Sequence, residues 1–261
     1  MNRDKLLQYA LPGGALLAAV FAWEAVVRIY DIQPVILPSP SLIVATLIKD
    51  WRTLLGSLEV TLSITFEALA AATIGGFLLA LVFAQSRVIE RAFFPFAVIM
   101  QVTPIISIAP LLLVYLTSGE AVLVCAFLVA FFPILANTAL GLSSVDHNLV
   151  DLFQLYRASR WRQLLWLRIP ASLPYFLGGL RIGGGLALIG AIVAELAAGN
   201  AGKGAGLAFR IAEAGYRLNI PRMFAALALI SATGIAIFAT LSALSAYLLG
   251  RWHESAAGPE R

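Results

Sequence analysis

Long apolar segments alternate with short polar ones along almost the whole chain. The apolar runs cover residues 9–29, 60–84, 93–116, 121–142, 175–198 and 224–249. An α-helix needs about 20 apolar residues to cross the hydrocarbon layer of a membrane, whereas barrel strands alternate over about 10. The pattern therefore predicts an all-α integral membrane protein, with about six transmembrane helices in a single domain over residues 1–261.

Composition supports a membrane protein and excludes several other classes. The chain is 61% hydrophobic and 12% charged, against roughly 25% charged in soluble domains. We attribute the formal charge of +4 to basic loops rather than to nucleic-acid binding. Cys125 stands alone in an apolar run, and no metal-ligand cluster, paired carboxylates or nucleophile–base pair can be assembled. We expect no catalytic residue, metal or cofactor on this chain.

The run at 93–116 contains Pro95, Pro104 and Pro110. Proline removes a backbone donor and clashes with the preceding turn, so three prolines in one span predict kinks or local unwinding.

A basic segment at 144–174 interrupts the apolar pattern. It contains "DLFQLYRASRWRQLLWLRIPASLP", in which two amphipathic stretches flank a break at Ala158-Ser159. Ser159 is the expected N-cap of the second helix. Pro170 is expected to end that helix, because proline disfavours helical backbone at the residue before it. On residue types alone, the segment suits either binding of anionic lipid or docking onto a partner protein.

Charge in the loops predicts the orientation. The loops at 86–91 and 157–168 carry two and four arginines, while the tight loop at 118–120 carries no basic residue. The positive-inside rule therefore places the basic loops and both termini in the cytoplasm.

Several ordered blocks of this sequence resemble a known family. Ala158-Ser159-Arg160-Trp161 matches an "ASRW" element, and the segment from Ile169 to Pro174 is similar to "LPAALP". Asp151 stands at the position of a family glutamate, and Arg157 at that of a glycine. Further similar blocks lie at 37–41, 100–116, 130–146 and 178–196. Together they resemble the permease subunits of binding-protein-dependent ABC importers, in the nitrate, sulfonate, taurine and thiamine-precursor branch.

The resemblance implies a non-catalytic subunit of an ATP-driven importer in the bacterial inner membrane. It implies a second permease copy, forming a homodimer, with a cytoplasmic ATPase dimer that holds ATP and Mg. An external binding protein would deliver a small organic anion, a sulfonate or a nitrogen heterocycle. The coupling residues it implies are Asp151, Arg157, Ala158, Ser159, Arg160, Trp161, Pro170 and Pro174.

Arg157 departs from the family pattern. Glycine is the residue that most easily adopts positive φ, so its loss leaves two possibilities. Either the turn is capped differently at Arg157, or it moves to Ala158-Ser159.

Polar residues inside the spans are candidates for the solute path, because such groups are costly in lipid. Gln101 and Thr103 adjoin Pro104 and are expected to face the interior. Asn137 is a further candidate, as is Glu195, which also suits a gate or a docking residue near the outer end. The alternative for each is a helix–helix hydrogen bond.

Other features of the spans are expected to be structural. Glu67 and Glu24 belong here, with Glu24 and Arg28 at ion-pair spacing. Glycines 183–185 are expected to allow close helix packing.

A free-standing secondary transporter or channel is the alternative function. Such proteins usually show paired broken helices in internal repeats, and no convincing repeat is visible here. An importer permease needs an ATPase and a binding protein, whereas a secondary transporter needs neither.

Overall fold

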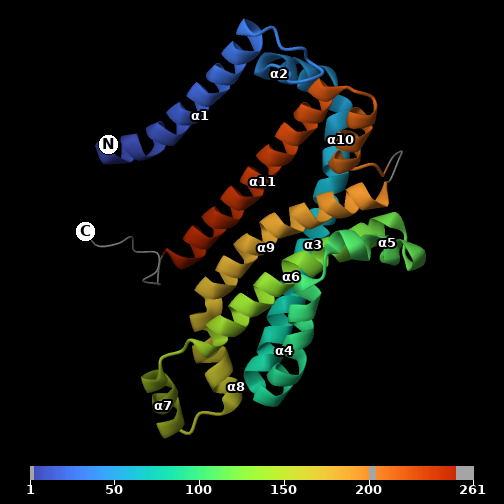
Figure 1. Ribbon diagram of the computed structural model, residues 1–261. Helices are drawn as coiled ribbons and strands as arrows, with labels where there is room; N and C mark the ends of the chain where they lie inside the picture. The colour runs from blue at the N-terminus through green and yellow to red at the C-terminus, as the bar shows by residue number, and fades with distance from the viewer. Residues whose placement is uncertain (1–2, 200–203, 251–261) are drawn as a thin grey trace.

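A computed structural model describes the backbone of residues 3–199 and 204–250, with side chains from residue 11 onward. Within these ranges the chain is helical and contains no strand (Figure 1). The helices are α1 (Arg3–Ile29), α2 (Pro40–Lys49), α3 (Trp51–Gln85), α4 (Arg87–Val102), α5 (Ile105–Tyr115), α6 (Ser118–Ser143), α7 (His147–Leu155), α8 (Arg160–Gln163), the π-helix η1 (Leu164–Arg168), α9 (Ile169–Ala198), α10 (Leu207–Tyr216) and α11 (Ile220–Leu249).

The expectation of about six spans is confirmed. Five helical segments of the described chain are long and apolar enough to cross a membrane: part of α1, then α3, α6, the continuous α8–η1–α9 and α11. The sixth is the pair α4 and α5, bent by 99°. The break lies at Thr103-Pro104, where Thr103 is extended with ψ 125° because the following proline disfavours helical backbone. Pro95 and Pro110 lie inside helices.

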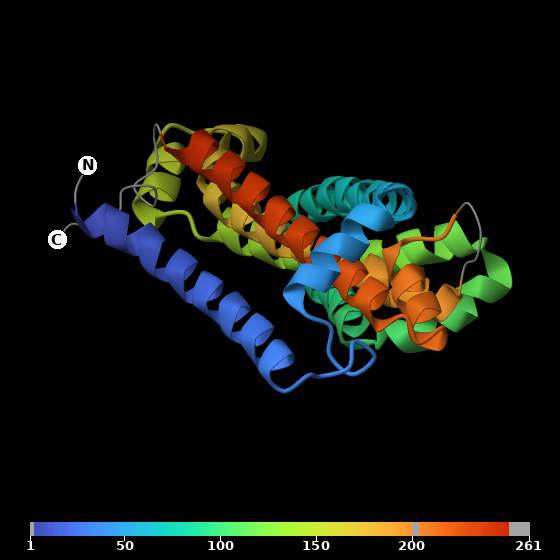
Figure 2. The ribbon, with the colours of Figure 1, turned by 90° about the horizontal axis from the view of Figure 1, so that it is seen from above.

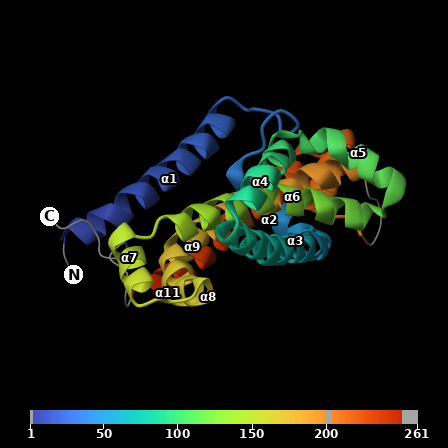
Figure 3. The ribbon, with the colours of Figure 1, turned by 90° about the horizontal axis from the view of Figure 1, so that it is seen from below.

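The core of the bundle is the contact between α6 and α9, with α3 packed against both (Figure 3). Small residues let the two backbones approach closely. A Cβ on Gly183 would lie 2.9 Å from the Ile134 side chain, and one on Gly190 would lie 2.9 Å from the Ala126 Cα. The packing role expected of glycines 183–185 is confirmed at Gly183 and Gly184, but it is wrong for Gly185, which faces open space in this chain.

Helix α1 stands apart from the other helices along most of its length (Figure 2). Its end is held by Glu24, whose carboxylate accepts hydrogen bonds from the Ser41 backbone amide (3.0 Å) and hydroxyl (2.8 Å). The expected ion pair with Arg28 is present at 2.6 Å, and Trp23 packs on Phe224 of α11. This end of α1 is therefore fixed, while most of the apolar side chains of α1 from Leu11 onward are exposed.

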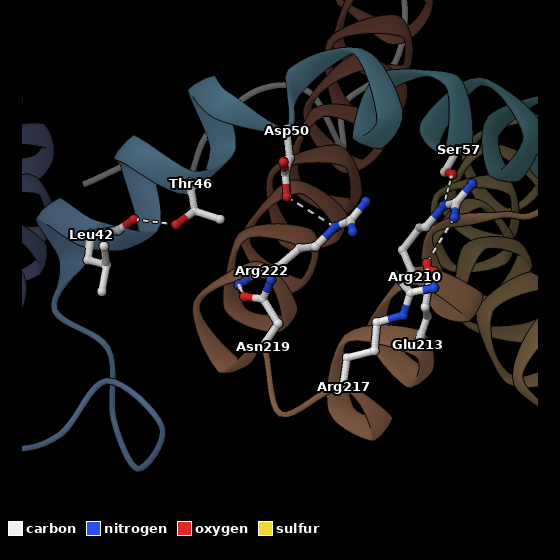
Figure 4. Close-up of polar contacts among 9 residues, drawn as sticks. All are labelled: Leu42, Thr46, Asp50, Ser57, Arg210, Glu213, Arg217, Asn219 and Arg222. Atoms are coloured by element: carbon white, nitrogen blue, oxygen red, sulfur yellow. Dashed lines mark hydrogen bonds and ion pairs between the residues drawn. The ribbon is translucent and has the colours of Figure 1, made fainter.

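A polar network fastens the elements at the end of the bundle opposite α7 and α8 (Figure 4). Arg222 of α11 pairs with Asp50 at 3.1 Å, and Arg210 of α10 donates to Ser57 of α3 at 2.9 Å. Glu213 pairs with both Arg210 and Arg217 at 2.9 Å. The hydrogen bond from Arg210, together with neighbouring arginine charges, holds the pKa of the Glu213 carboxyl below its usual value.

The close α6–α9 contact predicts that a larger side chain at its glycines will destabilise the protein. We expect Gly190→Leu to lower the thermal unfolding midpoint of the detergent-purified protein, because overpacking a tight contact costs about 1–3 kcal/mol. Gly185→Leu is the matched control, since a Cβ there meets no atom within 4 Å. Equal losses in both variants would contradict this packing.

Candidate functional site

The segment that joins α6 to α9 forms a helical projection at one end of the bundle (Figure 1). Asp146 caps α7, its carboxylate accepting from the Asn148 amide at 2.9 Å. Ser159 caps α8 as predicted, accepting from the Arg162 amide at 3.4 Å. The expected first short helix and the expected N-cap of the second are therefore confirmed.

The turn between these helices stays at Arg157, which adopts the left-handed conformation with φ 49°. The Ala158 amide donates to the Phe153 carbonyl (2.9 Å), and the Arg157 amide donates to the Gln154 carbonyl (2.8 Å). These two bonds define a Schellman motif, in which glycine usually takes the left-handed position. The alternative that the turn moves to Ala158-Ser159 is wrong. Arg157 adopts the glycine conformation at a cost of about 1–2 kcal/mol.

The prediction that Pro170 ends the second helix is wrong. The helix continues through Pro170 and Pro174 into α9. Before Pro170 the backbone widens into η1, where the Ile169 amide bonds to the Leu164 carbonyl five residues back. We attribute the continuity to this π turn, which accommodates a ring that otherwise collides with the carbonyl four residues back. The result is one helical rod over Arg160–Ala198.

The projection presents a basic and aromatic surface, which we call the coupling surface. Asp151, Arg157, Ser159 and Arg160 are exposed, as are Tyr156 (80%) and Trp161 (67%). Ala158 is half-buried, and its carbonyl accepts from the Gln163 side chain at 3.3 Å. Exposed aromatic and arginine side chains of this kind are typical anchors of protein interfaces.

The candidates Gln101, Thr103 and Pro104 lie together at the α4–α5 break. Thr103 is half-buried and donates to the Ile99 carbonyl of its own helix at 2.6 Å. Gln101 and Pro104 are exposed on the surface of the chain. The expectation that Gln101 faces the interior is therefore wrong for the single chain, and any solute contact at this break requires a path outside its own bundle.

Asn137 is half-buried between α6 and α9. Its amide group donates to the Pro133 carbonyl of its own helix at 2.8 Å, and a Cβ on Gly179 of α9 would lie 2.9 Å from the Asn137 Cβ. The structure therefore places Asn137 at the helix contact.

Glu195 forms a buried clamp between three parts of the chain. Its carboxylate accepts from the Thr61 hydroxyl (2.8 Å) and from the Ala208 amide (3.1 Å). The same hydroxyl accepts from the Leu207 amide at 3.0 Å, and the Gly206 backbone packs against the carboxylate. Glu195 thus ties α9 to α3 and to the start of α10, beside a cavity of about 230 Å³.

Two charged residues inside the predicted spans were not chosen as site candidates. Glu67 is exposed, and its side chain makes no hydrogen bond or ion pair within the described ranges, so the structure gives no support for its expected structural role. Arg181 is also exposed and lies 5.7 Å from the Phe238 ring. The four-residue spacing of Glu59, Ser63 and Glu67, all exposed on α3, was the available sequence signal. A charge at this depth requires a protein or aqueous surrounding.

Comparison with known proteins agrees with this architecture. The family model described as binding-protein-dependent transport system inner membrane component matches residues 72–255. The chain is 34% identical to the riboflavin transport system permease protein RibX of Chloroflexus aurantiacus, over 94% of this chain and 90% of that protein. It is 36% identical to the formylaminopyrimidine transport permease protein ThiX of Halalkalibacterium halodurans, over 87% and 90%.

More distant likenesses extend the comparison. The taurine transport system permease protein TauC of Escherichia coli is 27% identical, over 94% of this chain and 90% of that protein. The crystal structure of an amino acid ABC transporter has a TM-score of 0.63, covering 78% of this chain and 96% of that one. At 16% identity, that match shows a shared fold alone.

The Glu195 clamp generates a prediction about two equally buried threonines. We expect Thr61→Val to destabilise the detergent-purified protein by about 1–3 kcal/mol, because a buried carboxylate and the Leu207 amide both lose their partner. Thr65→Val is the control, since that hydroxyl bonds only to a carbonyl of its own helix. Thermal unfolding measures both, and a Thr65→Val loss as large as that of Thr61→Val would refute the clamp.

Proposed function

The chain belongs to the family of binding-protein-dependent transport system inner membrane components, the permease subunits of ABC importers, and from this premise we propose that it translocates a small nitrogen heterocycle as half of a homodimeric channel. A cytoplasmic ATPase dimer, which holds ATP and Mg, drives the cycle. The permease itself performs no catalysis. The family assignment leaves the alternative of a free-standing secondary transporter without support.

The coupling surface is the observation that carries the proposal. Arg160 and Trp161 are exposed at the start of the rod that continues into α9, and a short helix laid into a groove is a common mode of protein recognition. A displacement of α8 by the ATPase is passed into the bundle, because α8 and α9 are one continuous helix.

Uncovered charges support the homodimer and a shared path. Glu67 and Arg181 are exposed inside the predicted spans, where lipid is a poor surrounding for them. A second copy and an aqueous path between the two subunits would supply a suitable environment. Gln101 at the α4–α5 break is exposed in the same way and stays a candidate for solute contact.

The orientation follows from the charge of the loops. We place the coupling surface and both termini in the cytoplasm, with the protein in the bacterial inner membrane. The opposite end, fastened by the Asp50–Arg222 and Arg210–Glu213 pairs, then faces the external binding protein. The Glu195 clamp lies near this end and is suited to a gate.

The choice of solute class rests on the pattern of relatives. Those named for riboflavin and formylaminopyrimidine transport are 34% and 36% identical. Those named for aliphatic sulfonates, taurine and nitrate are 27–28% identical.

Substitutions of two exposed residues of the coupling surface test its docking onto the ATPase. We expect Arg160→Glu and Trp161→Ala to abolish most uptake into proteoliposomes containing the complete transporter, because the interface loses an anchor, while membrane insertion is retained. ATP hydrolysis by the complex should no longer respond to the loaded binding protein. Arg91→Glu, a reversal on the neighbouring basic loop, is the control. Normal uptake in both coupling variants would disprove the docking assignment.

Solute screening tests the cargo separately. We expect the cognate binding protein, measured by calorimetry, to bind a flavin or an aminopyrimidine at least tenfold more tightly than taurine or nitrate. Stimulation of ATP hydrolysis in the reconstituted transporter should follow the same order. Preferential binding of a sulfonate or nitrate would reject the heterocycle and leave the docking result untouched.

A further inference from the structure

A strongly basic hollow of about 480 Å³ lies beside the coupling surface. Three arginines, Arg87, Arg160 and Arg168, line it together with Gln85, Ser86 and Gln163. No acidic residue lines this hollow, and none of the three arginines forms an ion pair within the described part of the chain. Arginines from α4 and from the α8–η1 rod thus converge on one site without an ion pair, although Glu90 of α4 lines an adjoining cavity together with Arg87 and Arg168.

An apolar groove of about 390 Å³ lies between α3 and α9, where α9 is the continuation of the α8–η1 rod. Its lining includes Ile74, Phe77 and Leu78 of α3 and Ile169, Leu173 and Phe176 of α9. Leu78 and Gln85 are seven residues apart and so share a face of α3, about 10 Å along the helix. On the other rod Arg168 directly precedes Ile169. The hollow thus follows the groove along both helices, with no lining residue in common, and we call the two together the depression.

We propose that this depression binds an anionic phospholipid such as phosphatidylglycerol. Its phosphate lies against Arg87 and Arg168, whose guanidinium groups favour phosphate oxygens geometrically, and Arg160 is left to the ATPase. One acyl chain occupies the groove. A cationic hollow followed along the same helices by an apolar groove matches a lipid, whose charged headgroup is followed by apolar acyl chains.

The surroundings place the basic hollow at the level of lipid headgroups. Leu165 and Trp166 of η1 are exposed, Trp166 by 76%, and exposed tryptophan is enriched at the membrane interface. In the orientation proposed above this is the cytoplasmic leaflet, which attracts basic protein segments through its anionic lipids. Free phosphate or an acidic ATPase surface would satisfy the arginines but leave the groove empty.

Native mass spectrometry of the purified full-length chain, titrated with phosphatidylglycerol or phosphatidylethanolamine, tests the site. Two arginines each contribute roughly fivefold to anionic-lipid affinity. We therefore expect Arg87→Gln combined with Arg168→Gln to weaken phosphatidylglycerol binding roughly 25-fold. The control combines Arg91→Gln with Arg162→Gln, which removes the same charge from neighbouring positions outside the hollow. This pair should change the affinity for phosphatidylglycerol little.

Two further arms identify the occupant. Leu173→Trp fills the groove and should weaken the binding of phosphatidylglycerol without removing any charge. Millimolar inorganic phosphate, and separately the bound ATPase, should leave phosphatidylglycerol in place. Equal losses in the two arginine pairs, unchanged affinity in Leu173→Trp, or displacement by phosphate or by the ATPase would each overturn the proposal.

Discussion

The rest of the structure depends on the close contact between α6 and α9. Glycines at this contact bring the backbones so near that a methyl group at Gly190 would collide with the Ala126 Cα. Close-packed interfaces have few continuous deformations available. Since α7 and α8 connect these same two helices, the coupling surface is held at the end of the most rigid pair in the bundle.

The transition from surface to bundle runs through η1. A proline at position 170 would normally end or kink an α-helix, yet the rod continues through it, directly after the π turn over Leu164–Arg168. The surface helix α8 and the membrane span α9 are therefore one continuous helix. The proposed lipid site lies against the same turn, so a lipid bound there would contact the part of the rod that joins the coupling surface to the span.

Charge is divided unevenly between the two ends. At the α2–α10 end Arg222, Arg210 and Arg217 are paired with Asp50 or Glu213, and the Glu195 clamp is buried and satisfied. At the α7–α8 end Arg87, Arg160 and Arg168 have no acidic partner among the described residues. Paired charges fasten a surface, whereas unpaired ones need a ligand or a partner. In the single chain, the charges at the α2–α10 end are therefore mostly neutralised within the chain, whereas the arginines at the α7–α8 end are available to a ligand or a partner.

The sequence by itself determined the helical spans, an interruption in the span with three prolines, the helix before Arg157, the cap at Ser159 and the family resemblance, because each depends on local periodicity, caps or ordered motifs. It also placed the anomaly at Arg157, but only the fold showed that this arginine adopts the glycine conformation. Tertiary structure alone decided that Pro170 lies inside a continuous rod, that Glu195 is a clamp, and that Gln101 and Glu67 are exposed. Those outcomes depend on which residues distant in sequence meet in space, and on a π turn for which helical periodicity gives no signal.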